Sequence, residues 1–200
     1  MDYIEKYDSK IIYHFKVLRF VFKFLFRGEL NMKIINNMLL EDQSIDFIKG
    51  ICGDAEKILS DKKYRELKNF PRHKYTNTYD HSIRVAVGAA LIARVLGADE
   101  ESAVRVGLLH DMCFVNYYER NDHKGLFCFY HPVEAADNAH DEFGINDREM
   151  KDIRAHMFPL GWHVPSSKVA LALTLSDKAV AMYDGLYGIR MFRYMYCYMQ

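Results

Sequence analysis

Apolar residues recur at every third or fourth position along most of this chain, whereas the strict alternation of a half-buried strand is rare. This spacing is typical of amphipathic helices and predicts an all-α fold with about eight helices. The four prolines lie at positions 71, 132, 159 and 165, where helices can begin or end. No internal repeat, low-complexity block or Pro/Gly/Ser-rich linker interrupts the pattern. We therefore expect one domain over residues 1–200.

Capping residues and glycines place the ends of the predicted helices. The first third of the chain is expected to hold helices over about 3–27 and 43–68. Thr78 is expected to cap a helix that Gly97 ends, and Asp99 to cap the next, over 100–112. The remaining predicted helices cover 131–143, with Pro132 in its first turn and Gly144 at its end, 147–157, with a capping box of Asn146 and Glu149, and 167–183, opened by Ser166.

The two ends of the chain carry no functional motif. In the N-terminal extension, 1–68, the Phe-rich stretch 15–26 has its cations on one helical stripe and is about half as long as a membrane span. We interpret it as a helix packed on the domain, with membrane-surface or partner binding as the alternative. The aromatic-rich segment 185–200 is expected to be buried, and a homodimer interface is left open for it.

The charge balance and the cysteines narrow the class of protein. Lys plus Arg number 27 and so do Asp plus Glu, so no net positive field gathers nucleic acid or acidic lipid over the whole surface. We expect no stable nucleic-acid binding. The four cysteines form no CxxC pair and are too sparse for a disulfide framework. This usage predicts reduced thiols and a cytoplasmic location.

Three positions on the predicted helices carry candidate chemistry. His81 lies about one turn into its helix, where the helix dipole disfavours imidazolium and leaves a lone pair for a metal. His110 and Asp111 end the apolar run VGLLHD, and Asp177 shares a helix face with apolar residues. A carboxylate in apolar surroundings needs a cation. Any one of these residues, taken alone, is more often an ordinary part of a core.

As a set, these residues form the order H…HD…D, and the sequence resembles the HD-domain metal-dependent phosphohydrolases. The matching segments are TYDHSIRVA, GLLHD and LSDK. His131 in YHPVEAADNA and His156 in IRAHMFPL occupy the places of two histidines found in a subset of that superfamily. The likeness to small bacterial stand-alone HD proteins runs from about residue 69 to 184. It implies an HD-domain helical bundle whose metal-site core covers that segment.

The resemblance implies a ligand set for one or two divalent transition metal ions, with iron, manganese, cobalt, nickel and zinc all compatible. His81, His110, Asp111 and Asp177 would bind one ion, and Asp111 would share a second with His131 and His156. A metal-activated hydroxide would then attack phosphorus, with no serine or cysteine nucleophile. The implied catalytic residues are Asp111, His110, Arg84 and Lys178.

Further side chains are weaker candidates. Arg72, His73 and Lys74 precede the first motif and could meet phosphate, and His163 could line the mouth of a pocket. Glu134 and Asp152 could orient His131 and His156, although exposed helix acids are the more ordinary interpretation.

The sequence therefore predicts a metal-dependent phosphohydrolase that acts on a small phosphorylated compound, with a nucleotide as the first candidate. Two alternatives use the same residues differently. One is a regulatory or binding module with a structural metal site, and the other is a di-iron HD-fold oxygenase. The sequence identifies neither the substrate nor the metal.

Overall fold

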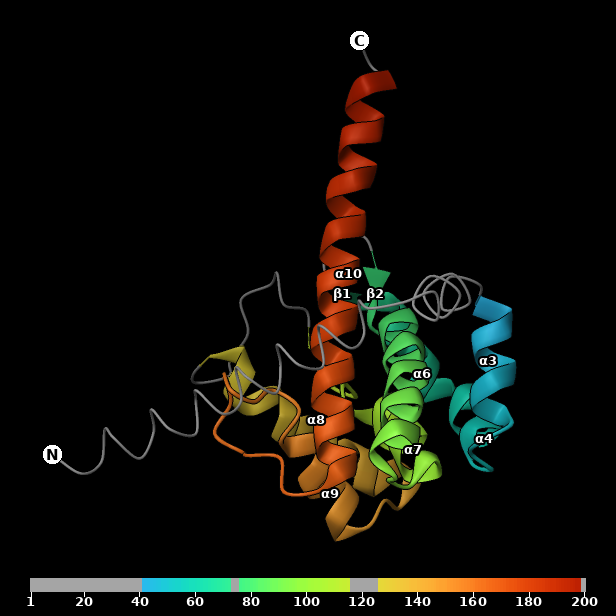
Figure 1. The fold of residues 1–200 in the computed structure, drawn as a ribbon, viewed down its shortest axis with the longest axis vertical. Coiled ribbons are helices and arrows are strands. Elements are labelled where there is room, and N and C mark those ends of the chain that lie inside the picture. The colour runs from blue at the N-terminus through green and yellow to red at the C-terminus, as the bar shows by residue number, and fades with distance from the viewer. Residues whose placement is uncertain (1–40, 73–75, 116–125, 199–200) are drawn as a thin grey trace, which may run out of the picture. The chain divides into compact units, whose positions relative to one another are not determined.

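The computed structural model describes residues 41–72, 76–115 and 126–198, and side chains within 43–185 of these (Figure 1). These residues lie within one compact unit, Glu41–Gln200. The helix predicted near 3–27 falls outside the described residues, as do the side chains from 186 onwards. That residues 1–200 form one domain therefore stays a prediction.

The described residues confirm the all-α prediction, with eight α-helices and one short hairpin. In chain order the elements are α3 (Glu41–Lys49), α4 (Ala55–Ser60), α5 (Lys62–Arg65), the 3-10 helix η1 (Glu66–Asn69), β1 (Pro71–Arg72), β2 (Thr76–Asn77), α6 (Thr78–Leu96), α7 (Glu100–Leu109), α8 (Phe127–Phe143), α9 (Asp147–Arg154) and α10 (Lys168–Tyr198). The strands β1 and β2 are antiparallel, and Arg72 pairs with Thr76.

Several helix ends differ from the prediction. The helix expected over 43–68 is broken into short pieces, because Gly50 and Gly53 follow α3 and Asp61 adopts an extended conformation between α4 and α5. Asn77, not Thr78, caps α6, and its side chain accepts a hydrogen bond from the Asp80 amide.

The later helices agree with the prediction more closely. Asp99 caps α7, and the capping box of Asn146 and Glu149 opens α9. Gly97 and Gly144 end α6 and α8 in the left-handed conformation that glycine adopts without strain. The prediction for the start of α8 is wrong, since this helix begins at Phe127 and contains Pro132 in its interior. The last helix, α10, extends far beyond the predicted end at residue 183.

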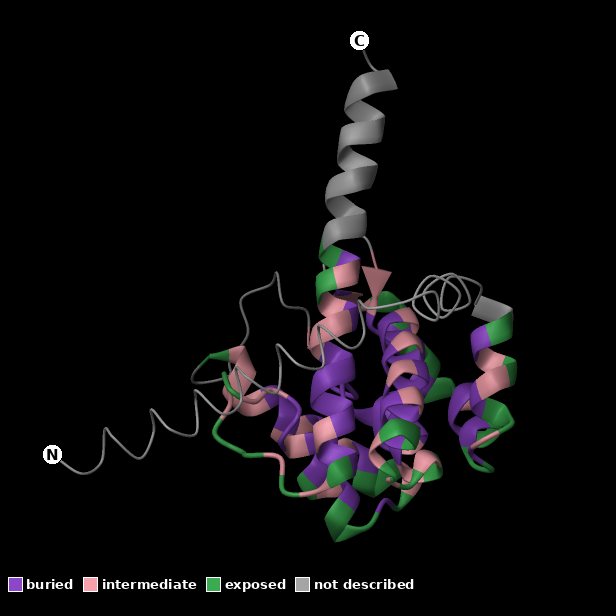
Figure 2. Cartoon of the chain, viewed as in Figure 1, coloured by how far each residue is buried: buried purple, intermediate pink, exposed green. Residues whose placement is uncertain are grey.

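The core forms where α6 packs against both α7 and α10 (Figure 1). Buried residues gather along these three helices (Figure 2). Helices α6 and α7 approach closely at Gly107, where an added Cβ would lie 2.6 Å from the Cα of Ala86. Small residues at this crossing therefore bring the end of α7 against α6, which is where the motif histidines lie.

Two further expectations bear on the class of protein. No helix within the described residues is long and apolar enough to cross a membrane. Among the described cysteines, Cys52, Cys113 and Cys128 are free thiols, as the sequence predicted.

Candidate metal centre

The structure brings together all six residues that the sequence named as metal ligands. They come from five parts of the chain: His81 lies on α6, His110 and Asp111 follow α7, His131 lies on α8, His156 follows α9, and Asp177 lies on α10. Each of the six is no more than 4% exposed. Such burial of polar side chains is costly unless they are paired or bind an ion.

The hydrogen-bond partner of Nδ1 determines which nitrogen of each histidine ring faces the centre. In His110, His131 and His156, Nδ1 lies 2.8 Å from a backbone carbonyl oxygen, of Gly107, Phe127 and Ile153 respectively. A carbonyl oxygen can only accept, so Nδ1 carries the hydrogen and the neutral ring presents a lone pair at Nε2. In His81, Nδ1 lies 3.0 Å from Asp184 Oδ2 and Nε2 lies 3.3 Å from Asp177 Oδ1, so the shorter contact favours the hydrogen on Nδ1. In the neutral form of each ring, Nε2 is thus the nitrogen that can bind a metal ion.

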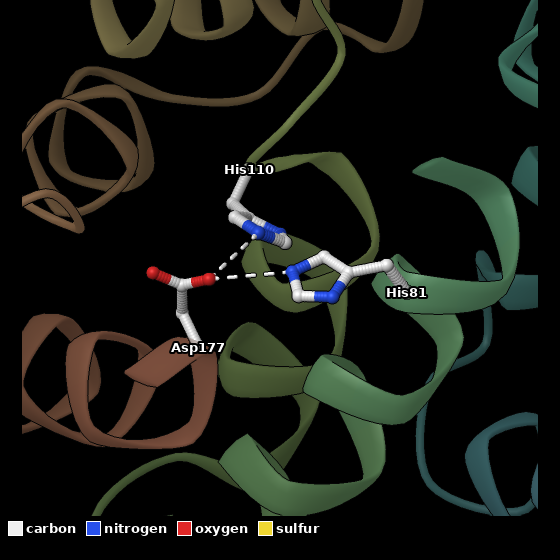
Figure 3. A group of neighbouring side chains, drawn as sticks. All are labelled: His81, His110 and Asp177. Carbon is white, nitrogen blue, oxygen red and sulfur yellow. Dashed lines mark hydrogen bonds and ion pairs between the residues drawn. The ribbon is translucent and has the colours of Figure 1, made fainter. Parts of the chain in front are cut away.

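His81, His110 and Asp177 form the first group of candidate ligands (Figure 3). The Oδ1 atom of Asp177 lies 3.3 Å from His81 Nε2 and 3.8 Å from His110 Nε2. Figure 3 shows the two rings and the carboxylate converging from three elements. Two imidazole nitrogens and a carboxylate oxygen suit a divalent transition metal ion.

Asp111 connects this group to a second one. Its Oδ2 lies 3.1 Å from His110 Nε2, whereas its Oδ1 lies 3.4 Å from His131 Nε2 and 3.6 Å from His156 Nε2. The Nε2 atoms of His131 and His156 are only 2.9 Å apart. Two neutral rings of the tautomer given above would direct lone pairs at each other at this distance. A cation between them removes the repulsion, so these residues fit a metal ion.

The hydrogen bonding of the centre supports the same conclusion. Among the described side chains, Nε2 of His110 and both carboxylate oxygens of Asp111 are buried without a hydrogen bond, although they make ion-pair contacts. Buried polar atoms of this kind call for an explanation, and a bound ion is one. The donor set does not distinguish iron, manganese, cobalt, nickel and zinc. A second ion at Asp111, His131 and His156 stays a prediction.

The charges around the two carboxylates keep both ionised. Burial raises the pKa of Asp111, but the charges of Arg72 and His110 outweigh it and hold that pKa well below its usual range. Burial likewise raises the pKa of Asp177, and the charge of Lys178 together with the neighbouring His110 and His81 holds that pKa well below its usual range. The centre therefore presents two negative charges to a cation.

The histidines respond to these carboxylates in opposite ways. Burial lowers the pKa of His110, but Asp111 and Asp177 raise it to about 9. Burial lowers the pKa of His131, and burial with the nearby charges of His131 and His110 holds that of His156 well below its usual range. In the metal-free protein a proton on His110 thus supplies part of the missing positive charge, and metal binding must release it.

These shifts predict how the stability of the metal-free protein depends on pH. The raised pKa of His110 contributes stability that is complete below about 6.5 and is lost as the pH rises through about 9. The lowered pKa values of His131 and His156 contribute stability above about 6.5 that is lost as the pH falls. We expect the urea midpoint to be highest near pH 6.5. A loss on the alkaline side that persists unchanged in His110→Ala would contradict this assignment.

Two basic residues named from the sequence contact carboxylates at the centre or behind it. Lys178 Nζ lies 2.7 Å from Asp177 Oδ2 and donates to the carbonyl of His156 at 3.0 Å. Arg84 Nη2 lies 3.1 Å from Asp184 Oδ1. Lys178 thus contacts the candidate ligand Asp177 directly. Arg84 contacts Asp184, which in turn contacts the candidate ligand His81.

Arg72 lies closer to the centre than its sequence context suggested. Its Nη2 is 2.5 Å from Asp111 Oδ2, and its side chain is 7% exposed. The guanidinium also lies over the ring of Phe127, 6.0 Å from its centroid. His73 and Lys74 fall outside the described residues. Arg72, the described residue of this basic segment, is thus placed to interact with a candidate ligand.

The carboxylates expected to orient His131 and His156 are not found behind these rings. Backbone carbonyls take that place at both histidines. Asp152 is buried and accepts a hydrogen bond from Ser167 Oγ at 2.7 Å, and Glu134 is half-buried on α8. His163 is exposed, so it takes no part in the buried centre.

Sequence reasoning missed Asp184, which is 1% exposed and contacts His81. The signal was present, because Asp184 lies two helical turns after Asp177 and therefore on the same face of α10. The resemblance to HD proteins extends only to about residue 184, and it implied no role for Asp184.

The comparison with protein families agrees with this geometry. A sequence model of the family described as "HD domain" matches residues 78–182, and the chain belongs to this family. The matched segment contains all six candidate ligands. Proteins with this domain are generally metal-dependent hydrolases, and the chain has a histidine and aspartate cluster that can hold a metal.

Two curated relatives, both named ribonuclease Y, match part of this chain. The chain is 33% identical over 89 residues to ribonuclease Y of Mycoplasma capricolum subsp. capricolum and, to the same extent, to ribonuclease Y of Mycoplasma mycoides subsp. mycoides SC. The similarity covers 40% of this chain and only 18% of each relative. No solved structure matches.

Proposed function

We propose that this protein is a metal-dependent phosphohydrolase that cleaves a phosphate ester or anhydride of a small molecule, with a nucleotide as the first candidate. The observation that carries the proposal is the convergence of the Nε2 atoms of four buried histidines on the carboxylates of Asp111 and Asp177. Family membership supports the reaction type. The cytoplasmic location remains part of this proposal, and a homodimer stays open.

The six candidate ligands divide into two proposed metal positions, and Asp111 belongs to both. His81, His110, Asp111 and Asp177 would hold one divalent ion, and the second oxygen of Asp111 with His131 and His156 would hold the other. When bound, such ions lower the pKa of water and offset charge on phosphoryl oxygens. The Nδ1 hydrogen bonds keep each imidazole in the orientation and tautomer that ligation requires.

Arg72 and Lys178 are the basic side chains that we assign to the phosphate of the substrate. Each is ion-paired with one of the two carboxylates, Arg72 with Asp111 and Lys178 with Asp177. If those carboxylates were to hold a metal ion, Arg72 and Lys178 would have part of their hydrogen-bonding capacity available for phosphate oxygens. The planar guanidinium of Arg72 suits two oxygens of one phosphate group.

The similarity to ribonuclease Y favours one other substrate, an RNA phosphodiester. The chain has 27 basic and 27 acidic residues. This balance argues against tight binding of a long RNA by this chain alone, because such binding depends on excess positive charge. A mononucleotide needs only local contacts at the metal centre.

A phosphate-release screen with purified protein tests the proposal. Mononucleotides, dinucleotides and a labelled single-stranded RNA would each be incubated with Mn²⁺, Co²⁺, Fe²⁺, Ni²⁺ or Zn²⁺. Release of inorganic phosphate from a mononucleotide is expected. Shortening of the RNA without phosphate release would favour the RNA phosphodiester instead. Stoichiometric metal binding with no turnover of any substrate would favour the regulatory module.

The two metal positions make a further prediction about stoichiometry. His131→Ala and His156→Ala should each lower the metal content from about two ions per chain to about one, because both rings belong to the same position. The measurement is elemental analysis after gel filtration. One ion per chain in the unmodified protein, with full activity in both variants, would show a centre with a single metal position.

A further inference from the structure

The four candidate histidine ligands differ in what holds them from behind. Nδ1 of His110, His131 and His156 faces a neutral backbone carbonyl, whereas Nδ1 of His81 lies 3.0 Å from a carboxylate oxygen of Asp184. Asp184 is 1% exposed, so water does not weaken this contact. Among the described histidines at the centre, His81 is the one supported by a charged group.

A single helix supports His81 on both sides. Asp177 and Asp184 lie two turns apart on α10, and the ring of His81 lies between them. Its Nε2 is 3.3 Å from Asp177 Oδ1, and its Nδ1 is 3.0 Å from Asp184 Oδ2. The packing of α6 against α10 therefore determines the position of this ligand.

Arg84 completes the arrangement. It lies three residues after His81 on α6, and its Nη2 atom is 3.1 Å from Asp184 Oδ1 and 3.3 Å from Oδ2. The two oxygens of Asp184 are thus engaged by two residues of α6 that lie one turn apart. With Arg84 in place, the carboxylate has little freedom to turn away from the ring of His81.

We propose that Asp184 is a positioning residue that orients His81 for metal binding, and that Arg84 acts through Asp184. This inference rests on the metal centre of the proposed function. A carboxylate that accepts from Nδ1–H makes the imidazole a stronger ligand and fixes its tautomer, and losing such a partner typically costs ten- to a hundredfold in metal affinity. The effect should be confined to the position of His81, His110 and Asp177, since Asp184 contacts neither His131 nor His156 in any described interaction.

Titration of the metal-free protein with Co²⁺ tests the proposal without reference to activity. Both equivalents would be followed by calorimetry and by the visible absorption of Co²⁺. In Asp184→Asn we expect one equivalent to bind roughly ten- to a hundredfold more weakly, with the other unchanged within about twofold. Asp184→Glu should recover part of the loss, because it restores the charge. Arg84→Gln should weaken the same equivalent by a smaller factor.

Asp137→Asn is the matched control, because it makes the same chemical change at a half-exposed aspartate that pairs with Arg154. It should leave both equivalents unchanged. If Asp184→Asn does not fold, Arg84→Gln decides the question. Unchanged Co²⁺ binding in a folded Asp184→Asn, or equal weakening of both equivalents, overturns the positioning role while leaving the phosphohydrolase proposal intact. Failure of the unmodified protein to bind Co²⁺ would instead overturn the proposed metal centre itself.

Discussion

Replacing Asp111 by asparagine is expected to abolish phosphate release and to remove most of the bound metal. The variant keeps the shape of the side chain but removes the charge that faces His110, His131 and His156. Losing an outer partner of a ligand costs about ten- to a hundredfold, so losing a carboxylate that serves both metal positions should cost more than about a hundredfold in turnover. Elemental analysis and a phosphate-release assay measure the two effects.

A buried aspartate outside the centre provides the control. Asp152 is 1% exposed and accepts from Ser167, so Asp152→Asn makes the same change without touching a candidate ligand. Loss of Asp111 also leaves the buried Arg72 without its carboxylate, which can destabilise the fold by about 3–5 kcal/mol. Circular dichroism therefore accompanies the assay, and His110→Ala provides a second route to the same result. Full turnover in either folded variant would refute the assignment.

Removal of metal is expected to lower the melting temperature by roughly 5–11 °C. In the metal-free protein the buried Asp111 and Asp177 both lie within 4 Å of His110 Nε2, and a proton on His110 supplies only part of the positive charge that a metal ion would bring. A ligand that binds only the native state contributes RT ln(1 + [L]/Kd), or about 2.7 kcal/mol at a hundredfold excess over Kd. For a chain of this length, 1 kcal/mol corresponds to about 2–4 °C. Differential scanning calorimetry with and without chelator measures the shift.

The same measurement on Asp111→Asn shows whether the stabilisation comes from this centre. That variant should give almost the same melting temperature with and without added metal, whereas Asp152→Asn should keep the full difference. An unmodified protein that has lost its metal, as shown by elemental analysis, yet melts at an unchanged temperature would contradict a buried metal site.

Helices with clear capping residues could be predicted from the sequence almost to the residue. Asp99 opens α7, the capping box of Asn146 and Glu149 opens α9, and Gly97 ends α6. These signals are local, because a capping side chain bonds to an amide within three residues. The start of α8 could not be predicted in this way, since Pro132 suits a first helical turn and the four residues before His131 join the helix without a capping side chain.

The ligand set was also readable from the sequence, because it depends on residue types in a fixed order. His81, His110, Asp111, His131, His156 and Asp177 all lie within one buried centre. Local context pointed to His81, Asp111 and Asp177, whereas His131 and His156 followed only from the resemblance to the family. The order H…HD…H…H…D then identified the family, which the comparison confirms.

Only the tertiary structure determines which side chains contact and orient the candidate ligands. The sequence by itself determined an all-α fold, the ends of its well-capped helices, and the candidate ligands, because periodicity, capping and motif order are properties of neighbouring residues. The pairing of Asp184 with His81 joins positions 103 residues apart, and that of Arg72 with Asp111 joins a hairpin to the end of α7. Such contacts depend on how α6 packs against α10 and how the hairpin folds back. No local sequence pattern shows which elements pack together. The sequence therefore could not show that Arg72 pairs with the candidate ligand Asp111 while Arg84 pairs with Asp184.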